Sequence, residues 1–166
     1  MIDTPFERYR TTVIPDWVDY NGHMNVAYYV LAFDQGVDKL FDALGVGGAY
    51  LARTGHSIFA LQAHLAYERE LRLGERLSVR SMVLAVDRKR MHLFHEMFHA
   101  EEGWRAATME SMAIHVEMAA RKSAPFPPDI LAGLEAAAAR HAGLARPSGI
   151  GRQIALPGVT PGAGPR

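Results

Sequence analysis

The chain contains no cysteine among its 166 residues. It therefore forms no disulfide, offers no thiolate nucleophile and has no cysteine-ligated zinc or iron–sulfur site. It also lacks any uninterrupted apolar run close to the ~20 residues that cross a bilayer. The first residues have neither the layout of a secretion signal nor that of an Arg- and Ser-rich transit peptide. We therefore expect a cytoplasmic protein that does not bind membranes.

An excess of charge of either sign is absent as well. Eighteen basic residues balance eighteen acidic ones, so the overall charge does not favour nucleic acid or an anionic membrane as a partner. Any anionic ligand must then be met by a local cluster of basic side chains. With 49% hydrophobic residues, the chain is long enough for one domain with its own core and short for two.

The most informative feature is the segment 16–25, which places polar side chains in a glycine-containing turn ahead of a helix. Apolar residues recur at helical spacing over 26–44, so an amphipathic helix is predicted with Asn25 as its N-cap and Gly45 as its stop. The first amides of such a helix have no partner within it and carry the positive end of its dipole. A polarised carbonyl could bind there, close to Asp19.

The rest of the chain predicts an antiparallel sheet. Alternating apolar residues or β-branched residues indicate strands at 8–14, 57–68, 77–85, 91–100 and 104–118. Short turns join the last four, which is typical of a meander. Because only one helix is long enough to cover such a sheet, the sheet must wrap around it. The fold class is thus α+β.

After the last strand, residues 121–128 are interpreted as a linker and 129–141 as a modest helix that Pro128 begins. Residues 143–166 are mostly Gly, Pro, Ala and Arg without periodicity. We therefore predict a single domain over residues 1–142 and a mobile C-terminal tail over 143–166.

The segment Asp19-Tyr20-Asn21-Gly22-His23-Met24-Asn25, followed by Tyr28 and Tyr29, resembles the hotdog-fold acyl-CoA thioesterases of the 4-hydroxybenzoyl-CoA thioesterase type. Their pattern is Asp-x-x-Gly-His-x-Asn, and the resemblance runs from about residue 8 to about residue 118. The stretches 17–24 and 89–97 are similar, more narrowly, to thioesterases of carnitine catabolism that act on betainyl-CoA. Those proteins tend to have Thr where this chain has Asn25.

The resemblance implies a long central helix wrapped by a curved antiparallel sheet of five or so strands. It implies that Asp19 attacks a thioester carbonyl or activates water, while the backbone amide near Val26 polarises that carbonyl. His23 is a candidate catalytic residue that could orient the substrate, transfer a proton, hydrogen-bond Asp19 or only pack, and Asn25 could add a second role to its cap. No cofactor is implied, because coenzyme A is part of the substrate. A homodimer or a dimer of dimers is expected.

Aromatic residues gather around the turn. Trp17, Tyr20 and Tyr28 are candidate substrate-binding residues, because the faces of Trp and Tyr attract a quaternary ammonium group. Ordinary core packing is the alternative, and it already explains the aromatic residues on the helical stripe.

Basic residues cluster in the turn Arg88-Lys89-Arg90. These side chains could meet the phosphates of coenzyme A or could be a solvated turn between two strands.

Four histidines, His92, His95, His99 and His115, raise the question of a metal site. On a strand, His92 points away from His95 and His99, and no cysteine supports them. We therefore expect no metal ligands.

The preferred hypothesis is hydrolysis of a small acyl-CoA. The alternatives are an acyl-CoA binding module that releases its ligand unchanged and a hotdog enoyl-CoA hydratase. Asp19 in the turn argues against the first alternative. The second requires an Asp/His pair in the sheet, which the sequence does not show.

Overall fold

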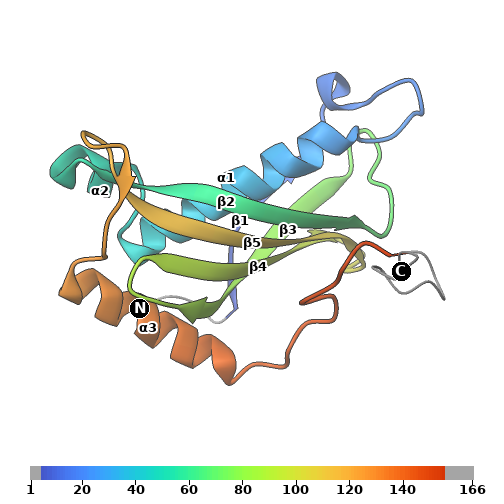
Figure 1. Ribbon diagram of the computed structural model, residues 1–166. Helices are drawn as coiled ribbons and strands as arrows, with labels where there is room; N and C mark the ends of the chain where they lie inside the picture. The colour runs from blue at the N-terminus through green and yellow to red at the C-terminus, as the bar shows by residue number, and fades with distance from the viewer. Residues whose placement is uncertain (1–4, 156–166) are drawn as a thin grey trace, which may run out of the picture.

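A computed structural model describes residues 5–155 of the chain (Figure 1). A long helix follows a short first strand, and the remaining strands come after the helix in sequence. The helices are α1 (Val26–Leu44), α2 (Gly48–Thr54) and α3 (Pro128–Ala142), with a 3-10 turn at Pro15–Trp17. The strands are β1 (Phe6–Thr12), β2 (His56–Tyr67), β3 (Arg76–Val86), β4 (Arg90–His99), β5 (Arg105–Glu117) and β6 (Lys122–Ser123).

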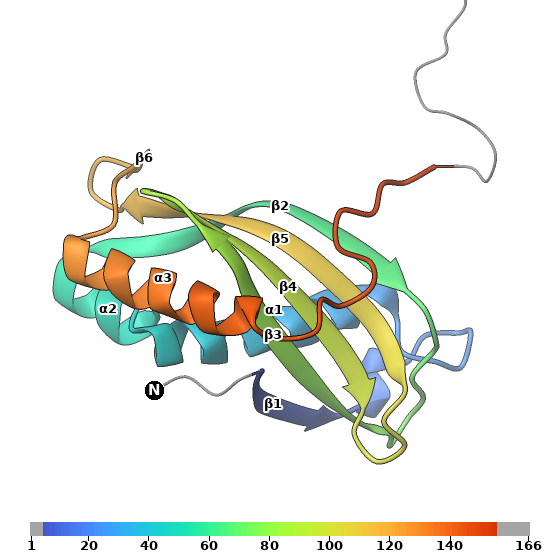
Figure 2. The ribbon, with the colours of Figure 1, turned by 90° about the horizontal axis from the view of Figure 1, so that it is seen from below.

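The strands form one curved antiparallel sheet in the order β1-β3-β4-β5-β2, and the short β6 pairs with β5. Figure 2 shows the sheet bending around α1, which confirms the predicted hotdog architecture. The prediction for the first strand was wrong in its bounds, because β1 begins two residues earlier and ends at Thr12. Both β1 and β2 are edge strands of this sheet. The predicted meander is confirmed for β3, β4 and β5 but wrong for β2, which pairs with β5 and not with the next strand in sequence, β3.

Helix α1 begins and ends as the sequence predicts. The Asn25 side chain accepts a hydrogen bond from the Ala27 amide, and Gly45 ends the helix in the left-handed conformation at φ 77°. Its buried face includes Phe33 and Leu40. A Cβ atom at Gly36 would lie 2.8 Å from a methyl group of Val79 on β3. Glycine is required at position 36 because the helix approaches the sheet so closely there.

Helix α2 was not predicted from the sequence. It is only two turns long, and Tyr50 is its single buried residue, so it lacks an apolar stripe. Helix α3 packs against β3, where Leu134 and Ala137 are fully buried. These two residues join Leu40 of α1 and Tyr50 of α2 in one apolar cluster that closes this end of the domain.

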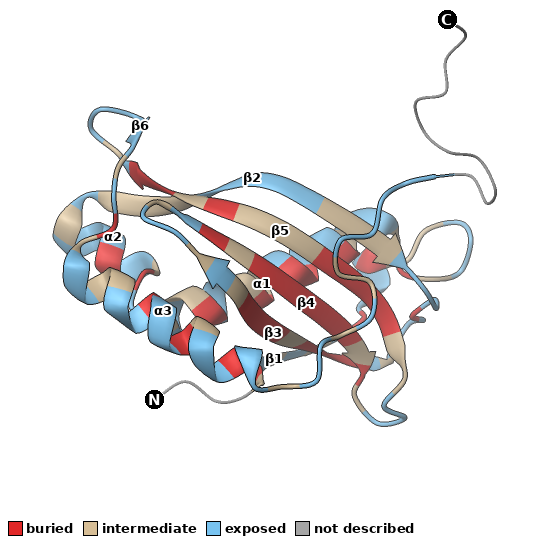
Figure 3. Ribbon diagram, turned by 60° about the horizontal axis from the view of Figure 1, so that its bottom comes forward, coloured by how far each residue is buried: buried red, intermediate tan, exposed pale blue. Residues whose placement is uncertain are grey.

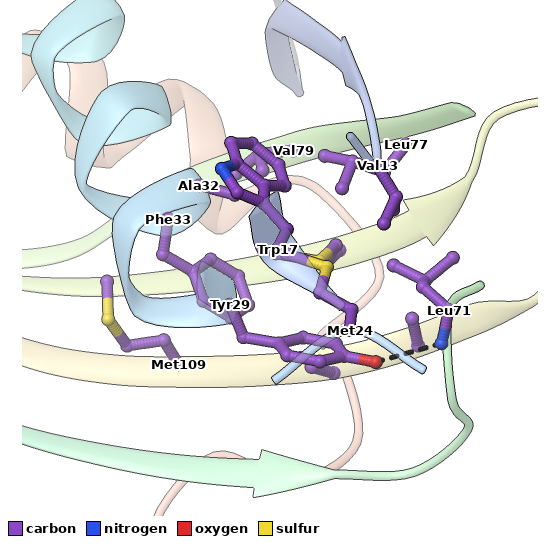
Figure 4. Close-up of a cluster of buried hydrophobic side chains, with 13 residues drawn as sticks. Val13, Trp17, Met24, Tyr29, Ala32, Phe33, Leu71, Leu77, Val79 and Met109 are labelled. Carbon is purple, nitrogen blue, oxygen red and sulfur yellow. Dashed lines mark hydrogen bonds between the residues drawn. The ribbon is translucent and has the colours of Figure 1, made fainter. Parts of the chain in front are cut away.

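A second apolar cluster lies under the first half of α1 (Figure 4). Phe33 and Tyr29 reach from the helix toward the sheet, and Trp17 and Met24 enter from the turn before it. The Tyr29 hydroxyl accepts a hydrogen bond of 2.9 Å from the Leu71 amide. This bond satisfies a backbone donor that is buried in the segment after β2.

Residues 143–155 run along the face of the sheet that points away from α1 (Figure 2). Arg105 of β5 donates to the Ser148 carbonyl and hydroxyl oxygens at 3.1 and 3.0 Å, and the Gly151 amide donates to Glu110 at 2.6 Å. The predicted division into a domain over 1–142 and a mobile tail over 143–166 stays a prediction. Residues 156–166 lie outside the described part of the chain.

None of the helices within residues 5–155 is long and apolar enough to cross a membrane.

Candidate active site

The segment before α1 is a closed loop. Val18 and Met24 form a β-bridge, and the Asp19 amide donates to the His23 carbonyl oxygen at 3.3 Å. The Gly22 amide donates to the Asp19 carbonyl oxygen, and Gly22 has a φ of 79°, which side-chain-bearing residues rarely adopt. The loop thus holds Asp19 in place directly ahead of the helix.

Asn25 ties the Asp19 carboxylate to the helix. Its Nδ2 atom donates to Asp19 Oδ2 at 2.8 Å, while its Oδ1 atom accepts from the Ala27 amide at 3.0 Å. The Asn21 amide donates to the other carboxylate oxygen at 2.8 Å. The bond from Asn21 and then the bond from Asn25 lower the pKa of Asp19 below its ordinary value. Asp19 is therefore a carboxylate at neutral pH, and its remaining lone pairs can attack or accept a proton.

The Val26 amide, the first of the helix, donates no hydrogen bond within the described residues. It carries the positive end of the α1 dipole, so it can donate to a carbonyl oxygen that gains negative charge during a reaction. A cavity of about 210 Å³ opens beside it, lined in part by Val26, His23 and Tyr67. The half-exposed Asp19 does not line this cavity.

His23 is half-buried, and its Nδ1 atom lies 3.2 Å from the Met24 carbonyl oxygen. Both Asp19 oxygens accept from other donors, and no bond joins them to the imidazole. Of the roles considered for His23, the structure supports a position at the cavity wall rather than a hydrogen bond to the carboxylate.

The three aromatic candidates do not surround one cavity. Trp17 is only 8% exposed and belongs to the core cluster of Figure 4, where it stacks on Tyr28 with ring centroids 5.6 Å apart. Tyr20 is 97% exposed on the loop. Packing therefore accounts for Trp17 and for the contact that Tyr28 makes with it.

Comparison with known proteins agrees with this arrangement. The model of the thioesterase-like superfamily matches residues 13–134. The chain belongs to this superfamily. It is 41% identical over 151 residues to the betainyl-CoA thioesterase of Pseudomonas aeruginosa, which covers 91% of this chain and 95% of that protein. A Rhizobium meliloti L-carnitine dehydrogenase/betainyl-CoA thioesterase is 37% identical over 150 residues, but the chain spans only 30% of its length.

Solved structures give the same result. A hypothetical protein from Staphylococcus aureus in complex with CoA has a TM-score of 0.85 and 28% identity, covering 95% of this chain and 98% of that one. A candidate thioesterase from Pseudomonas putida has a TM-score of 0.80 and 35% identity, with coverage of 93% and 99%. The resemblance expected from the loop sequence is thereby confirmed, and the protein is a thioester hydrolase.

The basic turn of this thioesterase lies far from Asp19 within one chain. Arg88-Lys89-Arg90 joins β3 to β4 at the end of the sheet opposite the loop before α1 (Figure 1). Arg90 pairs with Asp87 at 2.6 Å, and Lys89 Nζ donates to the Ser123 hydroxyl at 3.3 Å. Within one chain the basic turn and Asp19 therefore lie at opposite ends of the sheet.

The histidines of the thioesterase are engaged separately. His92 pairs with Glu110 at 2.7 Å, His115 lies 2.9 Å from the Tyr50 hydroxyl, and His99 stacks on Trp104. His95 is fully buried between two serines. Within residues 5–155, no three His, Asp or Glu side chains are grouped to hold a metal ion.

The sequence did not single out the cavity residues that follow β2. Tyr67 falls within the strand predicted over 57–68, on its apolar face, whereas in the structure it ends an edge strand and is 50% exposed. Residues 68–70, at and just after the end of the strand predicted over 57–68, were given no role, yet all three line the cavity beside Val26. Their nearness to the helix start depends on the sheet order, which no local pattern reveals.

Proposed function

We propose that this thioesterase hydrolyses betainyl-CoA to betaine and coenzyme A, with Asp19 as the nucleophile or general base. The observation that carries the proposal is the ionised Asp19 carboxylate, which Asn25 fixes to the start of α1 beside the unpaired Val26 amide. We infer that the acyl group is betainyl because the relative that is 41% identical is named a betainyl-CoA thioesterase.

In the proposed reaction, the thioester carbonyl oxygen accepts a hydrogen bond from the Val26 amide. Attack at the carbonyl carbon, by Asp19 directly or by a water that gives Asp19 its proton, forms a tetrahedral oxyanion that the amide and the helix dipole stabilise. The carbon–sulfur bond then breaks, and coenzyme A leaves as a thiolate that takes up a proton. Attack by water gives betaine at this point, whereas direct attack leaves a mixed anhydride of betaine with Asp19, which water hydrolyses to betaine and the Asp19 carboxylate. A thioester has a good leaving group, so this pair can suffice without a Ser-His-Asp relay.

Asn25 acts as a positioning residue in this proposal. Its single carboxamide both caps α1 and holds Asp19, so the carboxylate and the Val26 amide keep a fixed relation. His23 lies at the cavity wall next to them and bounds the space for the acyl group.

A homodimer through β2 is part of the proposal. Strand β2 is an edge strand whose side chains Phe59 and Leu61 are 38% and 56% exposed, and Figure 3 shows much of it pale blue. An open apolar edge is a template for pairing with a second strand.

The dimer gives the basic turn a role. Strand β2 runs from the end of the sheet that holds Arg90 toward the end that holds Asp19, since Phe59 pairs with Ile114 and Ile114 with Arg90. Antiparallel pairing of two β2 strands would bring the partner's basic turn toward the Asp19 end. There Arg88 and Lys89, which form no ion pair within residues 5–155, could meet the phosphates of coenzyme A, whereas Arg90 is paired with Asp87. We also propose that the protein is cytoplasmic, as the sequence leads us to expect.

The test is thiol release from betainyl-CoA by the purified chain, followed with a thiol reagent. The proposal expects one free thiol for each betaine formed. A binding module would bind the thioester without releasing thiol, which would contradict the proposal. A hydratase would release no thiol from betainyl-CoA but would change the absorbance of an enoyl-CoA offered in a parallel assay, which would contradict it as well.

A further inference from the structure

The cavity beside the Val26 amide is in the right place for the acyl group. It has a volume of about 210 Å³, and Val26, His23, Tyr67, Glu68, Arg69 and Glu70 contribute to its lining. In a betainyl thioester a single methylene separates the carbonyl carbon from the quaternary nitrogen. With the carbonyl oxygen at the Val26 amide, the trimethylammonium group must therefore lie close by, and this cavity adjoins the amide.

Tyr67 is the aromatic side chain that a ligand in this cavity can reach. Its ring meets that of Tyr29 edge to face, with centroids 5.3 Å apart and planes at 82°, and it remains 50% exposed. Tyr29 is itself 4% exposed and held by the Leu71 amide, so it fixes the position of the Tyr67 ring. A fixed aromatic ring with open surface suits a quaternary ammonium ion.

The charges around the cavity are compatible with a cation. Glu68 and Glu70 contribute two carboxylates to the lining. Arg69 also lines the cavity, but its guanidinium carbon lies 4.0 Å from the centroid of the Trp104 ring. Glu68 is paired with Arg105 and Glu70 with Arg72, so the aromatic surface, rather than net charge, provides most of the discrimination.

We propose that Tyr67 is the residue that sets the specificity of this enzyme for a cationic acyl group, with Glu70 adding electrostatic attraction. The trimethylammonium group contacts the Tyr67 ring while the adjacent carbonyl binds the Val26 amide. This inference rests on the proposed betainyl-CoA hydrolysis. It replaces Trp17, Tyr20 and Tyr28 as the ammonium site.

The experiment compares two thioesters that differ only in charge. In 3,3-dimethylbutyryl-CoA a carbon atom replaces the nitrogen of betainyl-CoA, so shape and volume are nearly unchanged. The wild-type enzyme should prefer betainyl-CoA in kcat/KM. Tyr67→Leu should lower kcat/KM for betainyl-CoA about 5- to 30-fold, which corresponds to the loss of a partly desolvated cation–π contact, and change the value for the neutral thioester less than about twofold.

Three further variants distinguish the effect of the Tyr67 ring from the effects of its hydroxyl group and of other residues. Tyr67→Phe keeps the aromatic surface and should retain the preference. Tyr20→Leu removes a tyrosine that is 97% exposed and lines no part of this cavity, so it should leave the ratio of the two kcat/KM values unchanged. Glu70→Gln, on the exposed segment after β2, should lower the preference by a smaller factor than Tyr67→Leu and tests the site without disturbing Tyr29.

An equal loss for both thioesters in Tyr67→Leu would overturn the inference, because it would show a packing role that does not sense charge. Values of kcat/KM in Tyr67→Leu that stay at the wild-type level for both thioesters would also overturn it. A wild-type enzyme that hydrolyses the neutral thioester faster than betainyl-CoA would instead contradict the proposed function itself, whatever the variants do.

Discussion

The fully buried His95 predicts how the stability of the fold depends on pH. It lies on β4 under α1, beside Phe33, with its Nδ1 atom 2.8 Å from the Ser81 hydroxyl and its Nε2 atom 3.4 Å from the Ser111 hydroxyl. Burial lowers the pKa of His95 from its ordinary value of 6.5 to about 3. The folded protein therefore keeps this imidazole neutral through most of the acid range.

The direction of the effect follows from the two pKa values. Below pH 6.5 the unfolded chain binds a proton at His95 and the folded chain does not, so acid favours unfolding. The stability that the fold has while His95 is neutral in both states is fully present above pH 6.5. It is lost progressively as the pH falls from 6.5 toward 3. A difference of one proton changes the free energy of unfolding by about 1.4 kcal/mol per pH unit. Between about pH 7 and pH 5 the loss is thus about 2 kcal/mol.

Urea unfolding at these two pH values, at constant protein concentration and ionic strength, measures the effect. With a slope of about 2 kcal/mol per molar urea, the midpoint should fall by about 1 M on going to pH 5. Burial also lowers the pKa of His115, which acts in the same direction, so the comparison needs a His95→Asn variant. That variant should be less stable at pH 7 and should lose about 2 kcal/mol less than the wild type on acidification. Equal losses in the two proteins would refute the argument.

Three further substitutions test the packing of α1 and α3 and the capping of α1. Gly36→Ala should lower the free energy of unfolding by about 1–3 kcal/mol in urea titrations, because the new Cβ would lie 2.8 Å from a Val79 methyl; unchanged stability would show that the helix can shift. Gly133→Ala places a Cβ atom in open space in α3. It should raise the free energy of unfolding by about 0.5–1 kcal/mol, because alanine has the higher helix propensity; a lower free energy of unfolding would contradict this expectation. Asn25→Ala should lower it by about 1 kcal/mol and also reduce kcat, since the same side chain caps α1 and holds Asp19; a stability loss with unchanged kcat would separate the two roles.

Much of the fold could be predicted from local sequence patterns. Helix α1 combines an N-cap, a regular apolar stripe and a glycine stop, three independent signals for one element, and the structure confirms them at Asn25 and Gly45. Alternation and short turns correctly predicted that β3, β4 and β5 are consecutive neighbours, but they wrongly placed β2 beside β3, whereas it pairs with β5 at the edge of the sheet. Helix α2 has no such signals, since it begins at Gly48 and buries only Tyr50, so tertiary packing determines it.

The site was only partly accessible from the sequence. The residues Asp19, Asn25 and Val26 lie within eight positions of one another, so a local motif brings them together. The cavity is different, because Tyr67 reaches the helix start only through the pairing of β2 at the edge of the sheet. The alternation of β2 identified which side chains share a face, but not that this strand has no neighbour on its outer side within one chain.

Replacing Asp19 tests the central claim most directly. Asp19→Asn keeps the size of the side chain and removes the charge that would attack the thioester or take a proton from water. The account predicts that kcat for betainyl-CoA falls by about 100- to 10,000-fold, while the unfolding temperature and the affinity for coenzyme A stay close to those of the wild type. An Asp19→Asn enzyme that releases thiol at a rate near that of the wild type would contradict the account.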